Sequence, residues 1–176
     1  KHLMIWENRD TAVLFGDGAG AVVVTPSENG SGILATHLGS DGANHQILHM
    51  PAGGSKMPYT VERIQNKDYK VEMNGQELFK RAVAKFVEAG QIVLDEAGIG
   101  IDDVALFVPH QANIRIMESA AQRLGIPMDR VAVNIERTGN TVAAVDGNLH
   151  RPRELHVAGD ACGVIGGDVG SAIVAG

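Results

Sequence analysis

The sequence predicts an α/β fold in which buried strands alternate with amphipathic helices. Short apolar runs of strand length recur along the 176 residues, and two longer segments between them carry apolar residues at helical spacing. The composition agrees, because 44% hydrophobic and 20% charged residues are typical of a globular protein with its own core. The 22 glycines suggest close backbone approaches, either between elements or to a ligand.

The apolar runs near the start of the chain predict strands. Residues 11–15 and 21–25 flank a glycine-rich stretch, 16–20, and predict two strands or one long strand with a glycine-rich middle. Residues 33–37 predict a further strand. From 38 to about 59 the chain is rich in Gly, Ser, Asn and Pro, which predicts a loop.

Two segments in the middle of the chain predict amphipathic helices. The first runs from about residue 75 to 97 and ends at Gly98, and the second ends at Gly125. Short apolar runs at 104–108 and 131–135 lie before and after the second helix and predict strands. The apolar positions at helical spacing are Phe79, Ala82, Val83, Phe86, Val93, Leu94 and Ala97 in the first helix, and Ile114, Met117, Ala121 and Leu124 in the second.

Charge and cysteine content exclude several classes of protein. Fifteen Lys and Arg against 21 Asp and Glu give a formal net charge of -6, which argues against non-specific nucleic-acid binding. A single cysteine excludes an intramolecular disulfide framework and a thiolate zinc cluster, and it suits a reducing compartment. No apolar run approaches the roughly 20 residues of a membrane span. The chain begins with Lys1 and stops directly after an apolar run, 171–175, so we expect it to be a fragment of a longer protein.

Three candidate sites have a stronger structural interpretation than a functional one. The stretch 16–21 matches the dinucleotide pattern G-x-G-x-x-A, but a strand-like run follows it where that pattern needs a helix, which favours tight backbone packing. His45 and His49 have helical metal-ligand spacing, yet the nearby glycines and Pro51 argue against a helix, so we expect a solvated or loosely packed pair. Cys162 has small neighbours and no sign of an activating base, which indicates an inert thiol.

The most informative candidates are two polar residues at predicted strand ends. His110 follows one strand directly and precedes a helix, where α/β folds present ligand-contacting groups. Asn140 lies in a turn after the next strand, so the two could donate hydrogen bonds to one carbonyl oxygen and form an oxyanion or enolate hole. Spacing alone favours a plainer interpretation, in which His110 starts a helix and Asn140 belongs to a turn beside Gly139.

Four motifs that occur in order favour the functional interpretation of His110 and Asn140 over the plainer one. Together they resemble the C-terminal half of β-ketoacyl-acyl carrier protein synthase III, the condensing enzyme that starts type II fatty acid synthesis. The resemblance runs from about residue 11 to 144 and implies a thiolase-like layered α/β fold, with central mixed sheets and packed helices. The motifs are FGDGAGA at 15–21, MNGQELF at 73–79, VPHQAN at 108–113 and GNTVAA at 139–144.

The resemblance also implies a domain organisation. Residues 1–35 correspond to the end of the family's N-terminal thiolase-like half, 36–70 to a connecting loop region, and 71–176 to the C-terminal half, which diverges after 144. The alternatives are another thiolase-fold condensing enzyme, such as a polyketide starter synthase or a 3-hydroxy-3-methylglutaryl-CoA synthase-like protein, or a non-catalytic fragment that binds carrier protein.

Residue by residue, the resemblance assigns roles. The family uses a Cys-His-Asn triad, in which His110 and Asn140 match the histidine and asparagine, while the cysteine lies upstream of Lys1 and is not matched by Cys162. The residues that match the pantetheine tunnel are Gly75, Gln76, Phe79 and Asn113, with Gln76 where some relatives have Asn. The residues that match the carrier-protein docking segment are Gln111, Ala112, Asn113, Ile114 and Arg115, with Arg115 as the cation for an acidic carrier.

The implied chemistry needs no metal or redox cofactor. Its substrates are a coenzyme A thioester and malonyl-acyl carrier protein, whose decarboxylation leaves an enolate with its charge on the thioester oxygen. Two donors such as His110 and Asn140 would each stabilise that charge by about 3 kcal/mol in the transition state. The family also implies a cytoplasmic homodimer with acyl-CoA and acyl carrier protein as partners, and neither nucleic acid nor membrane.

The tail departs from the family pattern. Residues 145–153 lack helical apolar spacing, and Pro152 would interrupt a helix. The segment 170–173 resembles the last family motif, but Asp168 and Val169 replace its Thr and Trp. A reading-frame shift or a divergent insertion near Val145 would explain both features. The tail therefore does not predict the closing strands of the fold or the loop that, in the family, completes the oxyanion hole for the acyl-cysteine.

Overall fold

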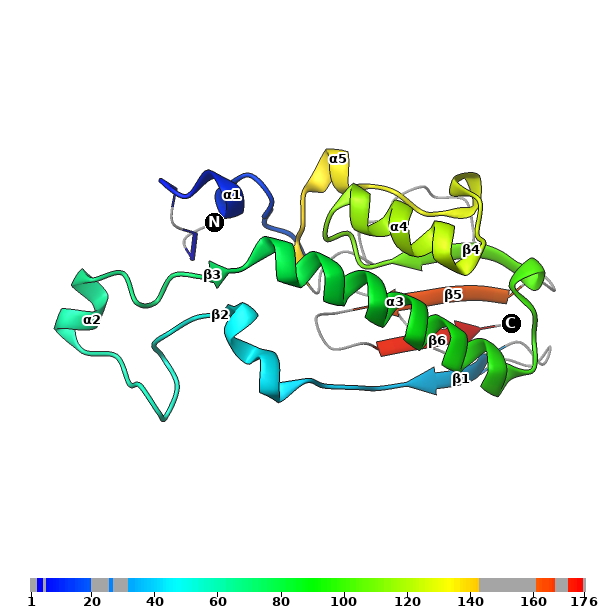
Figure 1. The fold of residues 1–176 in the computed structure, drawn as a ribbon, viewed down its shortest axis with the longest axis horizontal. Coiled ribbons are helices and arrows are strands. Elements are labelled where there is room, and N and C mark those ends of the chain that lie inside the picture. Colours follow the sequence, from blue (N-terminus) through cyan, green and yellow to red (C-terminus); the bar gives the residue numbers. More distant parts are fainter. Residues whose placement is uncertain are drawn as a thin grey trace.

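A four-stranded mixed sheet forms the centre of the structure, a computed structural model. It describes residues 3–4, 6–19, 26 and 32–142, together with the backbone of two further strands, 161–166 and 171–175. The strand order is β1 (Ile33–His37), β6 (Ser171–Ala175), β5 (Ala161–Gly166) and β4 (Val104–Pro109). Figure 1 shows the long helix α3 (Gly75–Ala97) lying across this sheet.

The pairing of the strands mixes both directions. β1 and β6 are antiparallel, with His37 opposite Ala172, and β6 and β5 are also antiparallel. β5 and β4 are parallel, with Phe107 opposite Gly163. β4 therefore runs with β5 and delivers the residues after Pro109 to one end of the sheet, where polar side chains of α/β folds commonly meet a ligand.

α3 covers the sheet because one of its faces is apolar. It begins after Asn74, whose side chain accepts the Glu77 N–H at 3.2 Å, and it ends at Gly98, which adopts a left-handed φ of 68°. The helix packs on β1, β5 and β6 and against α4 (Ile114–Leu124). Its buried residues are Val83, Phe86, Ala89, Gly90, Val93 and Leu94.

α4 repeats the same plan on a shorter scale. Asn113 precedes it and accepts the Arg115 N–H at 2.9 Å, while Gly125 ends it at a φ of 81°. Its buried face joins that of α3 and the β4 side chain Phe107 in one core. The buried residues of α4 are Ile116, Met117, Ala120 and Ala121.

An arm, residues 50–72, extends away from the sheet and carries α2 (Val61–Gln65), as Figure 1 shows. At its base β2 (Leu48–His49) pairs with β3 (Glu72–Met73) in a two-stranded antiparallel ladder. The contacts of the arm with the start of the chain include an ion pair from Lys67 to Glu7 at 3.2 Å and a hydrogen bond from the Val71 N–H to the Leu3 carbonyl at 2.9 Å. The remaining short helices are α1 (Arg9–Ala12), η1 (Gly42–Ile47), η2 (Ile101–Asp103), η3 (Met128–Arg130) and α5 (Ile135–Thr138).

The strand predicted at 11–15 is wrong for most of its length. Thr11 and Ala12 belong to α1, because the Asn8 side chain caps this turn by accepting the Asp10 N–H at 3.1 Å. Only Phe15 makes a strand-like pair, an isolated parallel bridge to Asn140. The strand predicted at 21–25 lies outside the described residues.

The strand predicted at 131–135 is also largely wrong. Val131 forms a single bridge to Phe107, and the next N–H, that of Ala132, donates to the Phe107 carbonyl at 2.8 Å. After that, the backbone N–H groups of Asn134 and Ile135 are bound by a side chain instead of a strand, and α5 begins at Ile135. The loop predicted at 38–59 likewise contains two short elements, η1 and β2.

Other elements match the sequence closely. β1 and α3 have the predicted bounds, β4 is one residue longer than predicted, and α4 ends at the predicted glycine. β5 and β6, by contrast, were not predicted from the tail. They lie between β1 and β4 and complete the sheet. Among the described residues, no helix combines the length and apolar character needed to cross a membrane.

Candidate active site

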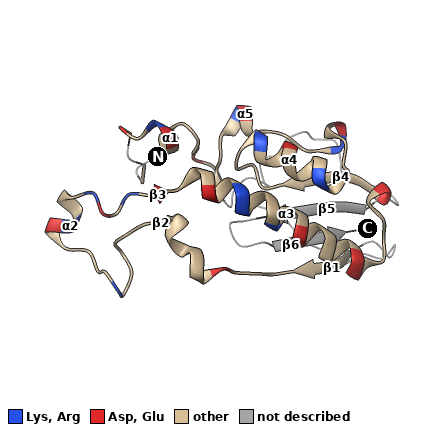
Figure 2. Ribbon diagram, viewed as in Figure 1, with Lys and Arg blue, Asp and Glu red and all other residues tan. Residues whose placement is uncertain are grey.

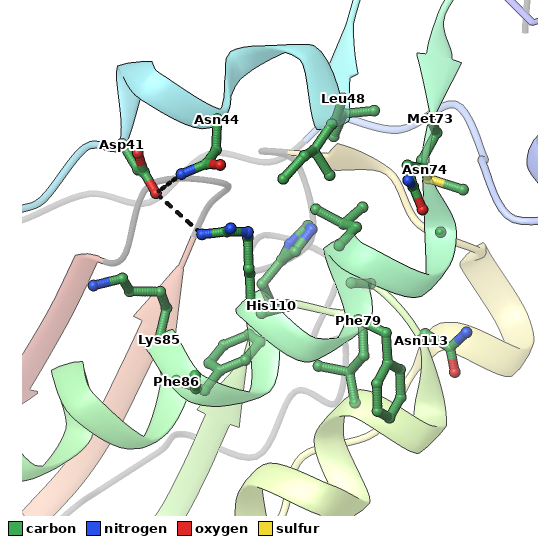
Figure 3. A pocket seen from close by; sticks show the side chains of 18 of the residues that line it. Asp41, Asn44, Leu48, Met73, Asn74, Phe79, Lys85, Phe86, His110 and Asn113 are labelled. Carbon is green, nitrogen blue, oxygen red and sulfur yellow. Dashed lines mark hydrogen bonds and ion pairs between the residues drawn. The ribbon is translucent and has the colours of Figure 1, made fainter.

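An open pocket of about 1450 Å³ lies between the first half of α3, η1 and the loop that follows β4. Figure 3 shows residues from these elements facing a common space around His110. The structure brings most of the predicted site residues to its walls. Those residues are Gly75, Gln76, Phe79, His110, Ala112, Asn113 and Asn140.

His110 is held where the sheet ends. It follows Pro109, the last residue of β4, and its carbonyl accepts the Ala112 N–H at 2.9 Å, which turns the chain toward α4. The residue is only 6% exposed, and Figure 3 shows its ring rising among the pocket-lining side chains of α3. An imidazole in this position can contact a ligand only from within the pocket. The residues that line the pocket therefore determine what the ring can bind.

Asn140 is fixed on both its backbone and its side chain. Its N–H donates to the Leu14 carbonyl at 2.9 Å, and its own carbonyl accepts the Gly16 N–H at 2.8 Å. The side-chain oxygen Oδ1 accepts the Val142 N–H at 2.9 Å. Because the amide oxygen is held in this way, the group left to face a ligand is the amide NH₂, which can only donate.

Two glycines, Gly16 and Gly139, allow the backbone around Asn140 to pack closely. A side chain on Gly16 would collide with the Thr138 carbonyl oxygen. Gly139 has a left-handed φ of 69°, and a Cβ there would lie 3.3 Å from both the Gly16 nitrogen and the Leu14 oxygen. For Gly16, the predicted role in tight backbone packing is confirmed.

The N-terminal ends of two helices, α3 and α4, lie at the wall of the pocket. Asn74, Gly75 and Gln76 bring the start of α3 to the wall, and Asn113 brings the start of α4. The N-terminal end of a helix carries unpaired N–H groups and a partial positive charge, which stabilise a negative charge nearby. Asn113 uses its Oδ1 to cap α4, so its amide nitrogen is the polar atom left for a ligand.

The polar rim of the pocket was not identified from the sequence. The Asp41 carboxylate accepts a hydrogen bond from the Asn44 side chain at 2.7 Å and lies 3.6 Å from Nη1 of Arg81 (dashed lines in Figure 3). Arg81 also donates through Nε to Glu77 at 2.9 Å, one helical turn earlier. The Glu77–Arg81 spacing was the only available signal, because the residues of η1 follow no pattern that links them to α3.

Burial corrects one predicted carrier-protein contact. Gln111 is completely buried and bonded internally, so it cannot touch a docked protein. Ile114, by contrast, is 38% exposed, and Arg115 is exposed beside it in the first turn of α4. Figure 2 shows basic segments on α4 and in the first half of α3. Within the predicted docking segment, the exposed residues are therefore Ile114 and Arg115.

Among the described residues, the two histidines do not belong to a metal site. His45 lies in η1 and His49 in β2, with ring centroids 6.4 Å apart, and the Glu72 carboxylate lies 4.0 Å from Nε2 of His49. In the described part of the chain, no three His, Cys, Asp or Glu side chains gather so as to hold a metal ion. Cys162 belongs to β5, where its backbone pairs between Leu106 and Ala175, and its predicted inertness stays a prediction.

Comparisons with known proteins agree with the motifs. Residues 94–145 match the family described as 3-oxoacyl-[acyl-carrier-protein (ACP)] synthase III C terminal, and residues 2–42 match 3-oxoacyl-[acyl-carrier-protein (ACP)] synthase III. The beta-ketoacyl-[acyl-carrier-protein] synthase III of Roseiflexus castenholzii is 48% identical over 143 residues, covering 81% of this chain and 43% of the relative.

Solved structures extend the likeness to nearly the whole chain. The 3-oxoacyl-[acyl-carrier-protein] synthase III of Aquifex aeolicus has a TM-score of 0.79 at 38% identity, covering 99% of this chain and 54% of its own. The priming β-ketosynthase of the R1128 polyketide pathway has a TM-score of 0.77 at 33% identity, covering 98% and 52%. The chain therefore spans about half the length of the relatives it matches.

Proposed function

This chain belongs to the β-ketoacyl-[acyl-carrier-protein] synthase III family, and from that membership we propose that it is part of an acyltransferase that joins an acyl-CoA primer to malonyl-acyl carrier protein and so initiates fatty acid synthesis. It has the thiolase-like layered α/β fold of the family. One observation carries the proposal. His110 and Asn140, which are distant in sequence, line a single pocket as buried polar groups.

The central step is decarboxylation. The bond between the malonyl methylene carbon and its carboxylate breaks, carbon dioxide leaves, and the electron pair enters an enolate whose charge lies on the thioester oxygen. His110 as a neutral N–H donor and Asn140 through its NH₂ group donate to that oxygen. The helix N-termini of α3 and α4 add a favourable field for the same charge. The methylene carbon then attacks the acyl thioester, and the cysteine thiolate leaves.

The thioester arm occupies the rest of the pocket. Gly75, Gln76 and Phe79 on α3 and Asn113 before α4 contribute apolar surface and two amide side chains to the walls, which suit a pantetheine chain. Ile114 and Arg115 are exposed on the adjoining turn, where an acidic carrier protein would dock. Coenzyme A thioesters enter the same pocket.

We propose that the acylated cysteine is not among the residues of this chain. In the family pattern it precedes the segment matched here, and the chain's one cysteine lies within the paired strand β5. The complete enzyme is proposed to be a cytoplasmic homodimer without a metal or redox cofactor. Full activity after dialysis against a chelator supports the absence of a metal requirement, and loss of activity contradicts it.

The proposal is tested in a hybrid enzyme, in which the N-terminal portion of the R. castenholzii relative is joined ahead of this chain. Carbon dioxide release from carboxyl-labelled malonyl-carrier protein should fall by about a hundredfold or more in His110→Ala and in Asn140→Ala. Transfer of a labelled acetyl group from coenzyme A to protein should suffer much less, because no charge grows on the malonyl oxygen in that step.

The double variant sharpens the test. It should be little worse than the poorer single variant, because two donors to one charge act as a unit. Gln122→Ala, on the exposed side of α4, serves as the control and should change neither step. Collapse of acyl transfer with decarboxylation intact would show that the roles given to His110 and Asn140 are wrong.

A second candidate function is priming of polyketide synthesis. It is favoured by the structural likeness to a priming β-ketosynthase at 33% identity. The two functions differ in the acyl primer and the carrier protein and share the decarboxylation step. Comparing condensation rates of the hybrid with a series of acyl-CoA primers, and with carrier proteins of the two pathways, separates them.

A further inference from the structure

The side chain of Gln111 has every hydrogen-bonding group satisfied inside the protein. Its Nε2 donates to the Pro109 and Ala132 carbonyls, each at 2.9 Å. Its Oε1 accepts the N–H groups of Asn134 at 2.8 Å and Ile135 at 3.3 Å. A primary amide offers two donors and two acceptor lone pairs, so these four bonds use its full capacity. The residue has no exposed surface.

These bonds join the two halves of the candidate active site. Gln111 follows His110 in sequence, and its bond to Pro109 holds the end of β4. Its other three bonds go to residues 132–135, the segment that leads into α5 and on to Asn140. No strand pairing connects residues 132–135 to β4 after the bond from Ala132 to Phe107, so the Gln111 amide replaces that ladder.

The held segment in turn positions the Asn140 turn. The Asn134 carbonyl accepts the Arg137 N–H at 2.9 Å, and the Ile135 carbonyl accepts the Gly139 N–H at 2.8 Å. The backbone of Asn134 and Ile135 is thus bound on one side by Gln111 and on the other by the residues just before Asn140. A chain of hydrogen bonds thus connects Gln111, the neighbour of His110, through Ile135 to Gly139, the neighbour of Asn140.

We propose that Gln111 is a positioning residue that sets the distance and orientation of Asn140 relative to His110. The inference rests on the proposed function, in which these two residues donate to one oxygen. Two donors help a transition state only when both reach the same atom at the right angle, and a displacement of about 1 Å can cost a hundredfold in rate. Gln111 acts without touching substrate.

Two variants dissect the amide. Gln111→Glu keeps the acceptor oxygens for Asn134 and Ile135 but, as a carboxylate, faces the Pro109 and Ala132 carbonyls without a donor. Gln111→Met keeps a similar length and removes all four bonds. Val93→Ala, a truncation deep in the α3 core and away from the pocket, is the matched control for a loss of stability alone.

The first measurement uses NMR spectra of the 176-residue chain. In Gln111→Met the side-chain amide signals of Asn140 should move, and amide exchange at Asn134, Ile135 and Gly139 should speed up. Asn140 is the informative reporter, because it is remote from Gln111 in sequence, whereas shifts at His110 follow from adjacency. Unchanged Asn140 signals in Gln111→Met, or equal changes in Val93→Ala, would overturn the proposal.

The second measurement is decarboxylation of malonyl-CoA by the hybrid enzyme that carries the same substitutions. Gln111→Met should lower kcat about tenfold or more with KM little changed, and Gln111→Glu should recover relative to the parent as pH falls, because the protonated acid regains one donor. In an Asn140→Ala background the Gln111→Met change should have no further effect, since its effect passes through Asn140. An undiminished effect in that background overturns the proposal.

These outcomes distinguish a failure of the positioning role of Gln111 from a failure of the proposed function. If the parent hybrid releases carbon dioxide and its Gln111 variants match it, the positioning role fails while the proposed function stands. If the parent hybrid releases none, the proposed function fails, and the NMR result alone decides whether Gln111 positions Asn140.

Discussion

At Asn140 one hydrogen bond decides which end of the side-chain amide remains available to a ligand. The Val142 N–H donates to Oδ1, and this leaves the NH₂ group, which can only donate, for a ligand. An asparagine held the other way round would present an acceptor and repel an enolate oxygen. The chemical role of the residue is therefore set by a backbone group two positions away.

Such details explain what residue-level prediction can reach. The motifs identified His110 and Asn140 and the α3 residues that line the same pocket. They did not reveal that Gln111 faces inward, because three of its four hydrogen-bond partners lie more than twenty positions ahead in a segment without periodicity. The Asp41–Arg81 contact was missed for the same reason.

Arg115 is predicted to act in docking and not in chemistry. In the hybrid enzyme, Arg115→Ala should raise KM for malonyl-carrier protein about fivefold at low ionic strength and less at high salt, because a rim cation mainly steers an acidic partner. Use of malonyl-CoA should be unchanged. Arg123→Ala removes the same charge from the other end of α4 and is the matched control. Equal losses with both malonyl substrates would contradict the assignment.

At the scale of elements, the two long helices were predictable because their signals are local. Each has an asparagine before it, an apolar face at helical spacing, and a glycine after it in left-handed conformation. The segments 11–15 and 131–135 were mispredicted because a short apolar run cannot distinguish a strand from the edge of a capped turn. Their conformations depend on Asn8 and Gln111, which the apolar pattern does not include.

The helix-ending glycines give a direct stability prediction. Gly98→Ala and Gly125→Ala should each lower the free energy of unfolding by about 1–2 kcal/mol, because an alanine in the left-handed region is strained even though space is open around it. Gly54→Ala, also in open space but without a positive φ, should change stability by less than about 0.5 kcal/mol. Urea denaturation of the chain measures all three, and equal losses would refute the conformational argument.

The base of the arm should respond to acid. A backbone hydrogen bond and then Lys67 lower the pKa of Glu7 below its ordinary value of 4.5. A lowered folded-state pKa means that the Glu7–Lys67 pair stabilises the contact above pH 4.5 and stops doing so as pH falls through the lower value. Exchange at the Val71 N–H, corrected for its intrinsic pH dependence, should rise a few-fold across that range.

Glu7→Gln tests the cause. It should abolish the change in Val71 exchange, because the remaining amide does not titrate. The effect stays small, since both side chains are exposed and solvent screens the pair. A pH response that persists in Glu7→Gln would assign it to another group.

At the scale of the whole molecule, condensation should need more than this chain. The 176-residue chain is predicted to form no ketoacyl product from acetyl-CoA and malonyl-carrier protein, because we propose that the acylated cysteine lies outside it. The hybrid enzyme should form it, and Cys162→Ser in the hybrid should leave the rate unchanged. Product from the isolated chain, or its loss in Cys162→Ser, would contradict the assignment of the nucleophile to another part of the enzyme.

The fold continues past the point where the sequence pattern stops. The family match ends at residue 145, yet the Aquifex aeolicus structure covers 99% of the chain, and β5 and β6 lie between β1 and β4 in the sheet. Pairing through the backbone requires only extended residues of the right length, so a divergent tail can still supply two strands. The partial match of residues 170–173 to the last family motif was not enough to predict both strands, because family motifs are defined by side chains.

The strand order has a consequence for how the protein comes into being. β5 and β6 occupy the middle of the sheet although they are the last of its strands to be synthesised, and β1 pairs with β6 across more than a hundred residues of chain. Contacts between such distant residues form slowly, because a long loop must close first. While the ribosome makes the residues between β1 and β5, α3 and α4 have no complete sheet to cover. Apolar side chains that the sheet would bury are then exposed, which is the kind of surface that chaperones bind. The sheet can assemble only after the tail emerges.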